Sequence, residues 1–147
     1  MNPQTVAPGN LVSLGRQLRR FLYTPPIFAL LDPWQCGWLD GGCRILGEAV
    51  VLWLGPEAAL TAVLGASGQT AHVLVRYRGW LIDGDGLTRA DTLIRRWLQV
   101  EHVAGAHLGS FERAPASPEI PSDREVSRRL AEQLESRFPV SLVRSLL

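Results

Sequence analysis

The sequence predicts a small α+β domain with an antiparallel sheet. Apolar residues recur at helical spacing in residues 10–22 and 42–54, and alternate with period two in residues 72–77 and 80–83. The elements follow the order helix, helix, strands, helix, helix. That order indicates helices grouped around a small sheet.

Composition limits the classes of partner. The chain has 147 residues, enough for one domain with a hydrophobic core. Its net charge of +1 argues against a nucleic-acid partner. No apolar run approaches the roughly 18 residues that a membrane span needs, and no signal-like apolar segment follows Met1. We therefore expect a cytoplasmic protein without a membrane partner, whose Cys36 and Cys43 are free. A disulfide between them is the alternative in an oxidising compartment.

The first predicted helix covers residues 10–22. Asn10 can cap its N-terminus through the side chain, and Pro25 and Pro26 end it. A loop rich in Pro, Trp and Gly then follows over residues 32–42.

The second predicted helix covers residues 42–54 and ends at Gly55-Pro56. Residues 59–64 fit a strand or a short helix, and the hairpin that follows favours a strand. That hairpin consists of residues 72–77 and 80–83. After it, we expect a third helix that runs from an N-cap at Thr88 to about residue 100.

The chain divides into a main unit, residues 1–113, and a C-terminal part. Residues 114–123 form a proline-rich connector, and residues 124–147 carry a charged helix that ends before Pro139. An apolar stripe at helical spacing runs along this helix and must be buried; its members are Val126, Leu130, Leu134 and Phe138. Burial on the same domain is the default. A docking or dimerisation arm for a second copy or a protein partner is the alternative.

A cysteine stands where the second helix begins. Cys43 follows Gly41 and Gly42, which we expect to leave room for a substrate. The positive end of the helix dipole favours a thiolate at this position, and the backbone N–H of Cys43 could stabilise an oxyanion. Because a lone cysteine on a helix is most often a small buried hydrophobe, a nucleophile needs further support.

Histidine and acids on the hairpin supply that support. A cysteine nucleophile needs a base and a group that orients the base. A two-residue turn at Arg78-Gly79 places His72 directly opposite Asp85 and diagonally across from Asp83. Both acids can therefore share a face with His72, and the register favours Asp85.

These segments resemble the core of the papain-like cysteine superfamily, which includes papain-type peptidases, cell-wall cysteine peptidases, transglutaminases and arylamine N-acetyltransferases. The resemblance lies in Gly41-Gly42-Cys43 and in the hairpin, and covers about residues 34–86. It implies a nucleophile helix packed on a small antiparallel sheet, here with extra N- and C-terminal helices. It also implies that Cys43 and His72 act with Asp83, which we rank before Asp85.

Other candidates lie in the loop before the second helix. Gln35 resembles the glutamine that precedes the nucleophile in papain and helps bind the oxyanion. Trp34 and Trp38 either line an apolar wall for a substrate or cover the core. Cys36 is a rival nucleophile without a helix behind it. Cys36 and Cys43 with a histidine match no common zinc-site spacing, so we expect no metal or other cofactor.

We therefore predict a thiol-dependent hydrolase or acyl transferase. Its substrate would be the amide or ester bond of a peptide, a protein or a small molecule. The alternative is a catalytically silent module of the same fold that binds a protein partner.

Overall fold

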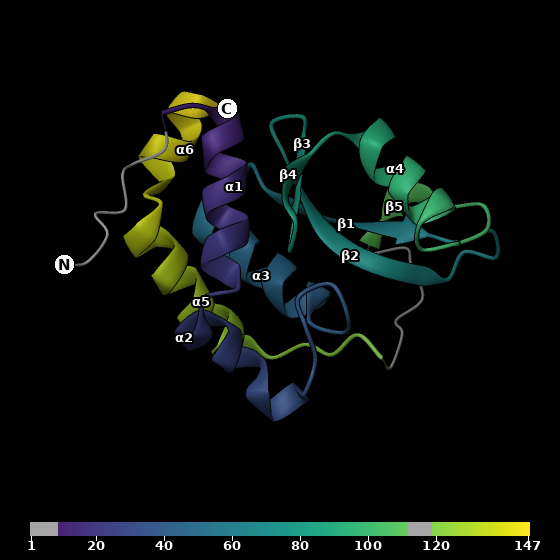
Figure 1. Cartoon of the computed structure of the whole chain (residues 1–147), viewed down its shortest axis with the longest axis horizontal. Helices are drawn as coiled ribbons and strands as arrows, with labels where there is room; N and C mark the ends of the chain where they lie inside the picture. The colour runs from purple at the N-terminus through teal and green to yellow at the C-terminus, as the bar shows by residue number, and fades with distance from the viewer. Residues whose placement is uncertain (1–8, 112–118) are drawn as a thin grey trace.

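A computed structural model describes residues 9–111 and 119–147, which form an α+β structure (Figure 1). The helices are α1 (Leu11–Leu22), α2 (Pro25–Phe28), the 3-10 helix η1 (Ala29–Trp34), α3 (Cys43–Leu54), α4 (Ala90–Gln99), α5 (Arg124–Arg137) and α6 (Val140–Leu146). The strands are β1 (Ala59–Leu64), β2 (Thr70–Tyr77), β3 (Trp80–Asp83), β4 (Gly86–Thr88) and β5 (His107–Ser110). The predicted class is confirmed, as is the strand at residues 59–64.

The five strands form one antiparallel sheet in the order β4-β3-β2-β1-β5. The turn at Arg78-Gly79 has two residues, as predicted, so Tyr77 lies opposite Trp80 and Val75 lies opposite Ile82. Beyond that pair, β3 ends at Asp83 and the chain turns back into β4. The expected continuation of the β2–β3 register to Asp85 is therefore wrong.

Alternating side chains of the sheet enter two separate apolar clusters. Val75, Tyr77 and Ile82 belong to the larger cluster, which also holds the buried side chains of α1, α3 and α5. Leu74 and Leu81 belong to a smaller cluster on the other face, which α4 covers. The sheet therefore has helices on both faces.

Local signals placed the first two long helices correctly. The Asn10 side chain accepts a hydrogen bond from the Ser13 N–H (2.9 Å), and α3 starts at Cys43 and ends at Leu54, followed by the C-cap Gly55 with a φ of 84°. The predicted cap of the third helix is wrong. Thr88 pairs with Leu81 as part of β4, and Arg89 is the N-cap of α4.

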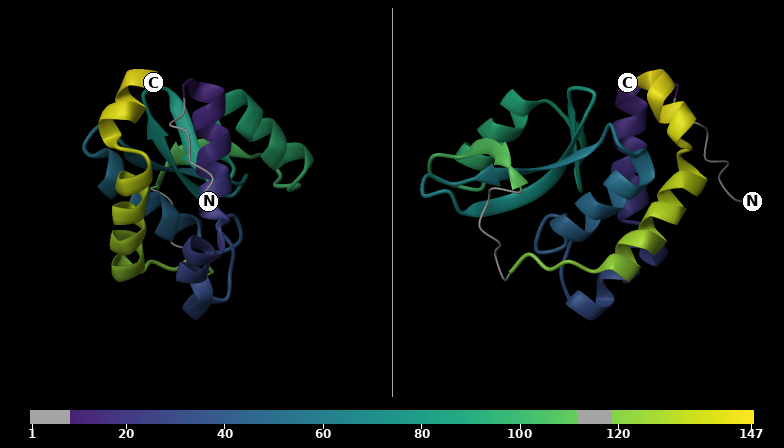
Figure 2. Two further views of the ribbon diagram at one scale, coloured as in Figure 1. Left: turned by 60° about the vertical axis from the view of Figure 1, so that its left-hand side comes forward. Right: turned by 180° about the vertical axis from the view of Figure 1, so that it is seen from behind.

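The C-terminal helix packs on the main unit. α5 lies beside α3 (Figure 2), and the four side chains of its predicted apolar stripe are buried in the larger cluster. The Phe138 ring contacts those of Phe21 and Trp53, with centroids 5.6 and 6.3 Å apart. The default prediction, burial on the same domain, is confirmed, whereas residues 114–118 of the predicted connector lie outside the described residues. In the two described ranges, no helix has the length and apolar character that a membrane crossing requires.

Candidate active site

Cys43 is the first residue of α3, and a tight loop sets the start of that helix. The Gly42 N–H donates to the Gly37 oxygen (2.9 Å). A Cβ on Gly42 would lie 2.7 Å from that oxygen and 2.9 Å from a Leu31 methyl carbon. Gly41 has a φ of 96°, which favours glycine. Gly42 is therefore needed for close packing, and room for a substrate in front of the thiol stays a prediction.

His72 and Asp83 form a buried pair on neighbouring strands. The Nε2–H of His72 donates to Oδ2 of Asp83 at 2.9 Å. The exposed fractions of the two residues are 0% and 3%. Asp83 is the last residue of β3, so its side chain reaches diagonally to His72 across the end of the hairpin.

Asp85 does not face His72. Its carboxylate forms ion pairs with Arg96 and, at 3.9 Å, with Arg19. Its backbone N–H donates to Oδ1 of Asp83 at 2.9 Å. The physical reason is the turn at Gly84-Asp85, which pairs Asp83 with Gly86 and so carries Asp85 out of the β2–β3 ladder.

The Cys43 sulfur lies against the part of β2 that carries His72. The Val73 N–H donates to Sγ of Cys43 at 3.4 Å. Because β3 has already ended, this segment of β2 meets the N-terminus of α3 in place of a further β3 residue. The structure thus brings Cys43, His72 and Asp83 together, as predicted from the sequence.

Opposing effects act on the imidazole. Burial of His72 lowers its pKa, but the hydrogen bond with Asp83 and the nearby Cys43 thiol raise it more, and the result is a pKa of about 9. Nδ1 is buried and makes no hydrogen bond of standard geometry within the described residues. Nδ1 is therefore the nitrogen left to exchange a proton with a thiol or a substrate.

Trp97 of α4 packs flat against the imidazole. The two ring centroids are 4.8 Å apart and the planes differ by 25°. In the sequence, Trp97 is one apolar residue of a helix. Helical spacing alone carries no signal that its ring meets His72.

The other predicted loop residues lie elsewhere. Trp38 is fully buried, and its Nε1–H donates to the Leu22 oxygen (2.7 Å), so Trp38 belongs to the core. Trp34 is exposed and donates from Nε1 to Oδ2 of Asp123 (2.8 Å). Gln35 is exposed and ends η1 with a φ of 51°. Among the described residues, no hydrogen bond links the Gln35 side chain to Cys43.

Cys36 has the features of a poor nucleophile. Burial raises the pKa of its thiol, and the charges of Asp40 and Cys43 raise the pKa further. Both cysteines are free. Within the described ranges, no group of three or more His, Cys, Asp or Glu side chains could hold a metal ion.

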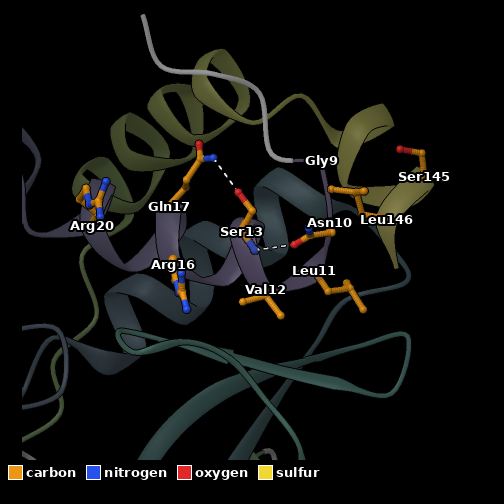
Figure 3. Close-up of a pocket in the computed structure, with 10 residues that line it drawn as sticks. All are labelled: Gly9, Asn10, Leu11, Val12, Ser13, Arg16, Gln17, Arg20, Ser145 and Leu146. Carbon is orange, nitrogen blue, oxygen red and sulfur yellow. Dashed lines mark hydrogen bonds between the residues drawn. The ribbon is translucent and has the colours of Figure 1, made fainter. Parts of the chain in front are cut away.

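Two open pockets of the surface lie away from these residues. One pocket of about 760 Å³ lies between the start of α1 and the end of α6 (Figure 3). Another, of about 660 Å³, lies along the Arg16–Tyr23 side of α1. Neither contains a residue of the Cys43–His72–Asp83 group, and the Cys43 residue itself is only 3% exposed.

No family model, curated protein or solved structure matches this chain. The candidate site is therefore defined by its own geometry.

Proposed function

We propose that this protein is a thiol-dependent hydrolase or acyl transferase that acts on an amide or ester bond. The observation that carries the proposal is the buried His72–Asp83 hydrogen bond of 2.9 Å beside the Cys43 thiol, with Nδ1 of His72 making no hydrogen bond of standard geometry to any described residue. A nucleophile, a base and a group that orients the base are the three parts that such chemistry needs.

The proposed reaction begins at sulfur. The Cys43 thiolate attacks the carbonyl carbon, an S–C bond forms, and the carbonyl π electrons move to oxygen. When this oxyanion collapses, the C–N or C–O bond breaks, and the leaving amine or alcohol takes a proton from Nδ1 of His72. Water or an acceptor amine then attacks the thioester and gives its proton to Nδ1, and Cys43 leaves as a thiolate.

The start of α3 suits the developing negative charge. The first turn of a helix carries backbone N–H groups without an intrahelical partner, and no side chain caps α3 at Gly42. The Cys43 N–H can therefore donate to the oxyanion. Donors in such a position stabilise a tetrahedral intermediate by about 3 kcal/mol each.

A papain-like core is part of the proposal. Helix α3, with Cys43 at its start, and the β2–β3 hairpin, with the histidine and the acid, support it. The substrate class stays a peptide, a protein or a small amide or ester. The two free thiols suit a reducing compartment such as the cytoplasm.

A silent binding module is the second candidate function. It is favoured by the burial of the site, since a thiol that is 3% exposed cannot meet a large carbonyl substrate without movement of its cover. The default packing of the C-terminal helix on α3 leaves the tryptophan loop, with exposed Trp34, as the surface for such a partner.

Iodoacetamide alkylation separates the two functions. An activated Cys43 is alkylated well below about pH 8.5, and we expect intact-mass and peptide analysis to find the label on Cys43 before Cys36. His72→Ala should return the rate to that of an ordinary thiol, whereas Cys36→Ala should leave it unchanged. Equal rates in wild type and His72→Ala would exclude an activated thiol.

Trapping of the acyl intermediate tests the reaction itself. Incubation with activated p-nitrophenyl esters should add one acyl mass at Cys43, and hydroxylamine should remove it. Cys43→Ala should abolish this adduct, and Cys36→Ala should retain it. An adduct that survives Cys43→Ala would contradict the assignment of the nucleophile.

A further inference from the structure

We infer that α4 positions the His72–Asp83 pair, through Trp97 on the imidazole and through Arg96 on the turn that carries the acid. This inference rests on the proposed function and names residues that act through others.

Trp97 restrains the plane of the histidine ring. Its indole stacks on the imidazole at a centroid distance of 4.8 Å, and it is itself only 8% exposed. Leu93 of the same helix lies in the same apolar cluster, which anchors α4 to the sheet. Rotation of the imidazole about its Cβ–Cγ bond would drive the ring into the indole, so the stack holds Nδ1 in one direction.

Arg96 restrains the acid through Asp85. The Arg96 guanidinium forms an ion pair with the Asp85 carboxylate, and the Asp85 backbone N–H donates to Oδ1 of Asp83. Because Oδ2 of Asp83 accepts from His72, both oxygens of the Asp83 carboxylate have a bonding partner. A carboxylate held at both oxygens cannot turn away from the imidazole without losing a hydrogen bond.

Two adjacent residues of one helix thus reach both members of the pair. Trp97 is buried beneath α4, and Arg96 lies at its edge beside the β3–β4 turn. Proton transfer at Nδ1 requires the ring to be held within a few tenths of an ångström of its productive position. The contacts of α4 supply this restraint from outside the three residues that would do the chemistry.

The pH profile of Cys43 alkylation tests the role of Trp97. If Trp97 only shields Cys43 from solvent, its removal changes the alkylation rate at the plateau of the pH profile. If Trp97 holds the His72 ring, its removal moves the midpoint of the profile toward the midpoint of His72→Ala. We expect Trp97→Ala to move the midpoint up by about one pH unit, a tenfold change in the thiolate–imidazolium population. Trp97→Phe, which keeps an aromatic stack, should move it by less than half as much. Leu98→Ala, on the exposed side of α4, is the matched control and should not move it.

The NMR titration of His72 tests the role of Arg96. Arg96→Gln should lower the pKa of His72 below about 9, because a loosened Asp83 stabilises the imidazolium less. Asp85→Asn should change the pKa of His72 in the same direction, and the double variant should change it by less than the sum of the two, since each single variant already removes the ion pair between Arg96 and Asp85. Arg95→Gln, the exposed neighbour on the helix, is the matched control.

The outcomes separate this inference from the proposed function. Wild-type alkylation equal to that of His72→Ala would refute the proposed function, and the His72 titration, which needs no reactive thiol, would still decide on Arg96. The inference about α4 would be overturned if the wild type is activated but the folded variants behave like it. That result would be an unchanged alkylation midpoint in Trp97→Phe and Trp97→Ala and an unchanged His72 pKa in Arg96→Gln. If circular dichroism shows that Trp97→Ala does not fold, Trp97→Phe and Arg96→Gln carry the test.

Discussion

The two ends of the β2–β3 hairpin differ in how the strands pair and in which side chains are buried. At the closed end, the two-residue turn joins Tyr77 to Trp80, and the ladder is regular. Tyr77 is buried there, whereas Arg78 of the turn is exposed and pairs with Glu57 at 2.8 Å. At the open end, β2 continues to Thr70 while β3 stops at Asp83, and the polar groups are buried.

The difference shows how an early strand end creates a site. Where two strands pair, their backbone groups satisfy each other. Where β3 turns away at Gly84-Asp85, β2 presents the Val73 N–H and the His72 side chain, and these meet the Cys43 sulfur and the Asp83 carboxylate. The open end therefore combines a helix start with a histidine–acid pair, and the closed end has only a turn.

Replacement of Asp83 at the open end by asparagine should have the largest effect on the site, and the same replacement of Asp85 is its control. Asp83→Asn removes the carboxylate that holds the imidazolium, so burial dominates and the pKa of His72 should fall from about 9 to below 6.5. Alkylation of Cys43 at pH 7 should slow by about tenfold or more. Asp85→Asn, two residues further on, should lower the pKa by much less. Equal changes in both variants, measured by NMR titration, would mean that Asp83 is not the orienting acid.

The stability of the fold should decrease at alkaline pH. His72 has a pKa of about 9 in the folded protein and an ordinary value of 6.5. Between these values the folded state keeps a proton that the unfolded state loses. The stabilising contribution is therefore complete below pH 6.5 and is lost as pH rises through 9. The free energy of unfolding should fall by about 3 kcal/mol over this range.

Urea unfolding at pH 6 and at pH 9.5 measures this loss. His72→Gln is the control, because it keeps a polar side chain without a titrating ring. Its stability should depend less on pH over the same interval. A decrease as steep in His72→Gln as in the wild type would assign the pH dependence to other groups.

Replacement of one glycine by alanine at each end of the hairpin should give the smallest effects on stability, and it compares the packing of the two ends. A Cβ on Gly84, at the open end, would lie 2.8 Å from Cβ of Trp38, which cannot move without the backbone. We expect Gly84→Ala to lower the free energy of unfolding by about 2 kcal/mol. At the closed end, a Cβ on Gly79 would lie 3.4 Å from the flexible end of Arg89. Its φ of 79° leaves a cost of about 1 kcal/mol for Gly79→Ala. Thermal unfolding of both variants would show whether the open end is the tighter one.

Local signals predicted much of the fold. Residues 11–22 and 43–54 are helical because their apolar spacing and their ends agree, with Asn10 at one start and Gly55 at one stop. The two-residue turn was predicted from Arg78-Gly79 between two alternating segments, and the pairing of Tyr77 with Trp80 confirms it. The short elements α2, η1, β4, β5 and α6 were missed, since three to seven residues are too few to establish a periodicity.

Of the candidate site, the residue types were predictable and several roles were not. Cys43, His72 and Asp83 stood out by their places at the ends of the predicted elements, and the structure brings them together, although β2 itself begins at Thr70. Trp38 proved to be core, and Gly42 proved to be a close contact with the Gly37 oxygen. Both roles depend on contacts that the local sequence does not reveal, since Trp38 meets Leu22 and Gly42 meets Gly37 and Leu31 only in the folded chain.

The sequence by itself determined where α1 and α3 begin, where the β2–β3 hairpin turns, and which residues are candidates for thiol, base and acid, because capping, turn chemistry and side-chain alternation are local. Only the tertiary structure decided between the two acids. The β3–β4 turn forms because β3 gains a second partner, and that pairing carries Asp85 to Arg96 while Asp83 stays beside His72. It also decided that α4 lies over the imidazole, since the contact of Trp97 with His72 joins two apolar surfaces that no local pattern connects.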